Sequence, residues 1–98
     1  MKQKEKMKEM IIRKENCSDE KNRYTYLLIM KESSNVASYG IPLYSIKVEM
    51  IDETGRLTSA EIRDVFADAG RAIIFYEKLV RKLATPIDLA YILEDEMS

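Results

Sequence analysis

The chain has 98 residues, of which 46% are hydrophobic and 34% are charged, and its formal net charge is −1. This length supports one domain with one core, and the abundant apolar residues exclude a disordered chain. No apolar run approaches the roughly 18 residues of a membrane span, and the basic start precedes too few apolar residues for a secretory signal. We therefore expect a frayed basic segment at residues 1–6 and a single cytoplasmic domain at 7–98.

The first half of the chain predicts strands. Residues 7–15 centre on Met10, Ile11 and Ile12, and residues 23–32 alternate between two faces. The polar turn formers at 16–22 separate these two runs, so we expect an antiparallel hairpin. Residues 36–41 predict a further short strand, which ends where Pro42 implies an edge, a bulge or a bend.

The segment 44–51 has the cleanest alternation, which predicts a half-buried strand with one wet face. Asp52 and Gly55 then suit a type I turn that returns the chain along this strand. Two interpretations of residues 56–66 stay open. Thr58–Glu61 resembles a helical capping box, but the turn demands a partner for the preceding strand, so the sequence favours a strand.

The last third of the chain predicts two helices. Asp68 is suited to cap a helix over residues 69–83, and Thr85-Pro86 with Asp88 marks the start of another. Apolar residues at spacings of three and four form the stripe of the first helix: Ala69, Ala72, Ile73, Tyr76, Leu79, Val80 and Leu83. We therefore predict an α+β domain, an antiparallel sheet of about four strands in ββββαα order covered on one face by two C-terminal helices.

Residues suited to catalysis are scarce. The chain has no histidine, and Cys17 is its one cysteine, so a Cys–His pair and a zinc site of the usual ligands are excluded within one protomer. Its three glycines are isolated and form no phosphate-binding loop. We expect a protein that is not an enzyme and that has no catalytic residue, no cofactor and no metal.

Tyrosine is abundant, with six residues. Tyr24, Tyr26 and Tyr44 are expected to share one sheet face, either as core residues or as an interaction surface, because tyrosine suits both environments. The absence of catalytic groups favours a small protein–protein interaction or regulatory domain. Its partner would be another protein or a second copy of the chain in a homodimer.

Basic residues suggest an alternative, a nucleic-acid-binding regulator. Arg71, Lys78, Arg81 and Lys82 would form a basic strip on the first helix. The net charge of −1 argues against nucleic acid as the partner, because nucleic-acid-binding domains are commonly basic.

Two short stretches resemble a family of uncharacterised proteins from Firmicutes, mainly clostridia. They are Tyr39-Gly40-Ile41 and the C-terminal pattern Thr85-Pro86-x-x-Leu89-x-x-Ile92-x-Glu94-Asp95. The similarity covers roughly residues 20–96. It implies a cytosolic bacterial protein of unknown role and supplies no activity, substrate or site residue.

Overall fold

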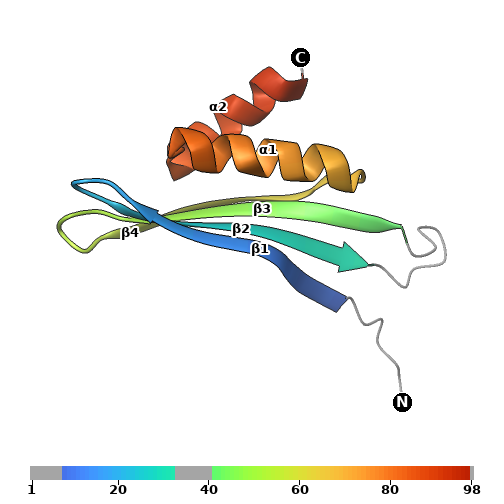
Figure 1. Cartoon of the computed structure of the whole chain (residues 1–98), viewed down its shortest axis with the longest axis horizontal. Helices are drawn as coiled ribbons and strands as arrows, with labels where there is room; N and C mark the ends of the chain where they lie inside the picture. Colours follow the sequence, from blue (N-terminus) through green and yellow to red (C-terminus); the bar gives the residue numbers. More distant parts are fainter. Residues whose placement is uncertain (1–7, 33–40, 98) are drawn as a thin grey trace.

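A computed structural model of the chain describes residues 8–32 and 41–97. The elements are β1 (Lys8–Ser18), β2 (Arg23–Glu32), β3 (Pro42–Ile51), β4 (Leu57–Phe66), α1 (Ala69–Lys82) and α2 (Pro86–Met97). The strands form one antiparallel sheet in sequence order, and both helices lie on the same side of it (Figure 1). The predicted α+β domain with ββββαα order is confirmed. The expected short strand at 36–41 lies almost wholly outside the described residues.

The core lies between the sheet and α1. Alternation places Tyr24, Tyr26 and Leu28 of β2 on the helix side, beside Ile46 and Val48 of β3, and all five are buried. The predicted helix stripe supplies the upper layer, with two differences. Ala69 is exposed, and Phe75, which the stripe left out, is only 1% exposed. The predicted stripe was too narrow because α1 packs across three strands, β2, β3 and β4. A helix that covers three strands needs a wider apolar face.

Two carboxylates shape the hairpin turns. Asp19 accepts hydrogen bonds from the backbone N–H groups of Lys21 and Asn22 at 2.9 and 2.8 Å, which tightens the β1–β2 turn. β1 therefore runs to Ser18, whereas the sequence suggested a loop from residue 16. In the β3–β4 turn Asp52 accepts from the N–H groups of Thr54 and Arg56. Gly55 there has a φ of 88°, which an L side chain rarely adopts.

Residues 57–66 are a strand, and the helical interpretation of Thr58–Glu61 is wrong. This strand pairs with β3, so the hydrogen-bonding demand of β3 outweighs the local capping pattern. The register shifts near Asp64, whose φ is 52° and whose N–H donates to Ser45 Oγ at 2.8 Å. This irregularity brings Phe66 opposite Tyr44, so the end of β4 reaches the core.

The helix ends follow the predicted caps. Asp68 accepts from the N–H of Gly70 at 3.2 Å and begins α1. The backbone N–H of Thr85 donates to the Asp88 carboxylate at 3.1 Å, and the N–H of Asp88 donates to Thr85 Oγ1 at 3.2 Å. This reciprocal pair is the predicted capping box, with Asp in place of Glu. It fixes a sharp corner between α1 and α2.

Candidate functional site

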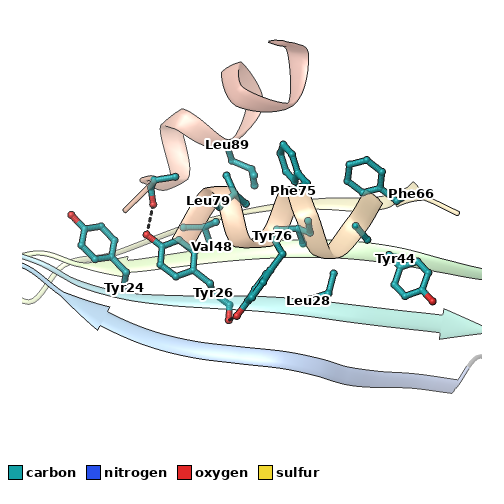
Figure 2. Close-up of a cluster of buried hydrophobic side chains, with 13 residues drawn as sticks. Tyr24, Tyr26, Leu28, Tyr44, Val48, Phe66, Phe75, Tyr76, Leu79 and Leu89 are labelled. Atoms are coloured by element: carbon teal, nitrogen blue, oxygen red, sulfur yellow. Dashed lines mark hydrogen bonds between the residues drawn. The ribbon is translucent and has the colours of Figure 1, made fainter. Parts of the chain in front are cut away.

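The three tyrosines that were candidates for an interaction surface are buried. Tyr24, Tyr26 and Tyr44 share one sheet face, as predicted, and are 4%, 0% and 8% exposed. That face lies beneath the helices, because the apolar stripe of α1 has no other apolar layer to pack on (Figure 2). The tyrosines are therefore core residues of the protomer.

The tyrosine hydroxyls connect the sheet to both helices. The Tyr26 hydroxyl donates to the carbonyl of Ala84, at the corner between α1 and α2, over 2.8 Å. The Tyr76 hydroxyl of α1 donates to the carbonyl of Tyr26 over 3.1 Å (Figure 2). Burial raises the pKa of both phenols, because the charged form would lose its hydration. Both hydroxyls therefore hold the sheet and the helices together through hydrogen bonds to backbone carbonyls.

The opposite face of the sheet carries neither helix (Figure 1). We call this surface the bare face. Its members follow from the strand register: Thr25, Leu27, Ile29 and Lys31 on β2, with Glu49, Lys47, Ser45 and Leu43 opposite them on β3, and Asn16, Lys14, Ile11 and Glu9 opposite them on β1. The sequence did not indicate which face of the sheet the helices leave uncovered, because β2 carries apolar residues on both of its faces. That pattern is typical of a strand that is covered twice.

The bare face carries aliphatic side chains at its centre and charged side chains beside them. Leu27 and Ile29 are central and half-buried, and Ile11 beside Ile29 is 57% exposed. An ion pair of 3.4 Å joins Lys47 to Glu49 next to them. Both side chains are about one-third exposed, and an ion pair that water reaches contributes little stability. The face offers an aliphatic patch with a charged margin.

A shallow pocket of about 310 Å³ lies at the hairpin end of this face. Its lining residues are Asn16, Cys17, Ser18, Arg23, Tyr24, Thr25, Glu49, Ile51 and Leu57. Thr25 Oγ1 donates to Asn16 Oδ1 at 3.0 Å, so two of its polar groups are already paired with each other. The pocket extends the bare face as a mixed polar and apolar hollow.

The predicted basic strip lies on α1, where its residues differ in surroundings. Lys78 donates to Glu96 of α2 at 3.2 Å, and the Arg71 guanidinium lies 5.8 Å from the centre of the Phe66 ring. Arg81 and Lys82 are exposed in the last turn, where cations suit the helix dipole. Two of the four residues therefore have interactions within the fold.

The described residues offer neither a metal site nor a membrane-spanning helix. Within residues 8–32 and 41–97, no three metal-ligating side chains lie close enough together to hold an ion. In the same part of the chain, neither helix has the length and apolar character needed to cross a bilayer.

Comparison with known proteins identifies one family. A protein-family model described as a family of unknown function, DUF6514, matches residues 7–98. No curated protein and no solved structure matches the chain.

Proposed function

The chain belongs to the DUF6514 family, whose function is unknown, and we propose that it is a small non-enzymatic interaction domain. It would bind another protein, or a second copy of itself, through the bare face of its sheet. The setting we propose is the bacterial cytoplasm, which the resemblance to clostridial proteins implies. A regulatory role would follow from the partner that the domain holds.

The observation that supports this proposal is the one-sided cover of the sheet. Both helices pack on the face that carries Tyr26 and Val48, whereas the face that carries Leu27 and Ile29 has no second layer among the described residues. A contiguous aliphatic patch with a polar rim is typical of an interaction surface.

The dimensions of the sheet suit a modest interface. Four strands of about ten residues each present roughly 600 Å² per face at the usual strand spacing and rise. Two such faces would bury about 1,200 Å² in total, the lower end of the range for specific complexes. We therefore expect association that is specific but of moderate strength.

Substitution of Leu27 and Ile29 by Lys tests the proposal. Neither side chain belongs to the core, so we expect the variant protein to fold. It should no longer associate in sedimentation or light scattering, and it should no longer retain a partner. Ile87→Lys is the matched control, because Ile87 is 71% exposed on α2, on the helix side of the molecule. Unchanged association of the Leu27 and Ile29 variants would rule out the bare face.

Nucleic acid binding through Arg71, Lys78, Arg81 and Lys82 is the alternative, and we do not favour it. Lys78 is paired with Glu96, and the net charge is −1. Retention on heparin at low salt, lost when Arg81 and Lys82 are replaced by Ala, would reverse this preference.

A further inference from the structure

β1 is an edge strand with exposed apolar side chains. Met10, Ile11 and Ile12 are consecutive, and they are 55%, 57% and 38% exposed. In the described sheet only β2 pairs with β1, so the outer side of β1 presents a row of backbone N–H and C=O groups. Such a row is a template for another strand, and proteins usually protect it.

The other edge of the sheet is protected. β4 carries exposed charges at Glu61 and Arg63, which form an ion pair of 3.6 Å. Asp64 follows with a φ of 52°, where the register of β4 shifts. Charges and irregular backbone both discourage edge pairing. β1 also carries charges and one extra residue, but its central residues Met10, Ile11 and Ile12 are apolar and exposed, which makes it the more available of the two edges.

β1 contains one extra residue. Ile11 lies opposite Ile29 and Arg13 lies opposite Leu28, so Ile12 is additional relative to β2. Side chains alternate between the faces of a strand, and the extra residue reverses this alternation. Glu9 and Lys14 are five positions apart and would face opposite sides of a regular strand. In β1 both lie on the bare face, opposite Lys31 and Leu27.

We propose that two copies of the chain pair antiparallel along β1, about a two-fold axis that passes between Ile11 and Ile12 and stands perpendicular to the sheet. The inference goes beyond the proposed function, because it uses the outer edge of β1 in place of the bare face and names a second copy as the partner. In this register Ile11 lies opposite the partner subunit's Ile12. Met10 lies opposite the partner subunit's Arg13, and Glu9 opposite the partner subunit's Lys14.

Charge and face both match in this register. Residues directly opposite each other in an antiparallel pair point to the same face. Glu9 and Lys14 share the bare face, and Met10 and Arg13 share the helix side, where they lie opposite Met30 and Leu28. The two-fold axis repeats the Glu9–Lys14 pair on either side of the isoleucines. Both strands carry the same extra residue beside the axis, so their lengths match across it.

The resulting assembly is one continuous antiparallel sheet of eight strands. The axis is perpendicular to the sheet, so it leaves both pairs of helices on one side and both bare faces on the other. Pairing from residue 9 to residue 14 would add roughly six backbone hydrogen bonds. It would also double the bare face that is presented to a further partner.

Charge reversal with mixing tests the register. Glu9→Lys alone places two like-charged pairs across the axis, and so does Lys14→Glu alone. Each variant should dimerise about tenfold more weakly than the unmodified chain. An equimolar mixture restores opposite charges at both pairs, so heterodimers should form with the original affinity. Sedimentation equilibrium from about 1 µM to about 1 mM measures this, a concentration range that covers weak to moderate association.

The control uses the protected edge. Glu61→Lys, Arg63→Glu and their mixture make equivalent changes on β4, and we expect no effect on dimerisation. Glu9 also lies opposite Lys31 within the protomer, so circular dichroism must show that the Glu9 variant folds. Hydrogen exchange of the unmodified chain gives a second measurement. Amides of residues 9–14 should exchange more slowly at high concentration, while those of 57–66 should not change.

The outcomes separate this inference from the proposed function. Recovery of affinity in the Glu9/Lys14 mixture supports the β1 pairing. If the charge reversals leave the dimer affinity unchanged but Leu27→Lys abolishes the dimer, the β1 pairing is overturned and the bare face is the interface. A strict monomer over the whole concentration range would also overturn it, and binding of a different protein by the bare face would then decide the proposed function.

Discussion

The Tyr26 hydroxyl connects the sheet to the corner between the helices, and Tyr26→Phe tests how much this contact stabilises the fold. Tyr26 is 0% exposed, and its hydroxyl donates to the backbone carbonyl of Ala84, a residue that is 2% exposed. Phe retains the packing of the ring and removes only the donor. The carbonyl of Ala84 then loses a hydrogen bond in a place that water does not reach easily.

The expected cost is about 1–3 kcal/mol, because a buried acceptor is left without its donor. A loss of about 2 kcal/mol lowers the melting temperature of a domain of this size by roughly 8–16 °C. Urea unfolding followed by circular dichroism gives the free energy of unfolding directly. Tyr91→Phe is the matched control, since Tyr91 is 68% exposed on α2, and its effect should stay within about 0.5 kcal/mol.

The prediction is refuted if the free energy of unfolding of the Tyr26→Phe protein lies within about 0.5 kcal/mol of that of the unmodified chain. Such a result would mean that water reaches the Ala84 carbonyl once the hydroxyl is removed. A loss far above the expected range would instead show that the hydroxyl positions the ring. In that case the corner between α1 and α2 depends on the Tyr26 hydroxyl for its position.

Three further predictions concern the core, the turn and pH. Leu79→Ala removes a side chain that is 0% exposed and should cost about 2–5 kcal/mol in urea unfolding, whereas a cost below about 1 kcal/mol would place it outside the core. Gly55→Ala should lower the free energy of unfolding by about 1–2 kcal/mol because of the φ of 88°, although nothing lies within 4 Å of the added carbon. Gly70→Ala, in the first turn of α1, is the control and should not lower it. Equal losses in the two variants would contradict the strain argument. Burial raises the pKa of Tyr26 and Tyr76 above the ordinary value of 10.0, so their contribution to stability is complete below pH 10 and is lost as the pH rises above it. Unfolding midpoints measured across that range should fall, and a flat profile would contradict the burial of the phenols.

The sequence predicted the elements whose signals are local. Asp68, Thr85 and Asp88 cap helices through backbone groups a few residues away, so their roles could be read without the fold. Asp52 and Gly55 likewise determine a turn by themselves. Alternation in β2 and β3 predicted which side chains share a face, because that property belongs to the single strand.

The candidate site was less predictable. The tyrosines suited both a core and a surface, and the choice depends on which face α1 covers. The alternation of β2 places Leu27 and Ile29 on its second face. That this face is uncovered follows only from the position of both helices on the opposite face of the sheet. The extra residue at Ile12 leaves no mark in the sequence, because it exists only relative to β2.

The sequence by itself determined the strands before residue 52, the two helices, and the turns and caps, because each of these depends on contacts between near neighbours. The tertiary structure decided that residues 57–66 are a strand, that the tyrosines are buried and that Leu27 and Ile29 lie on an uncovered face. These choices depend on hydrogen bonds and apolar contacts between segments far apart in the chain. Such contacts outweigh local propensity wherever a sheet must find its partners and its cover.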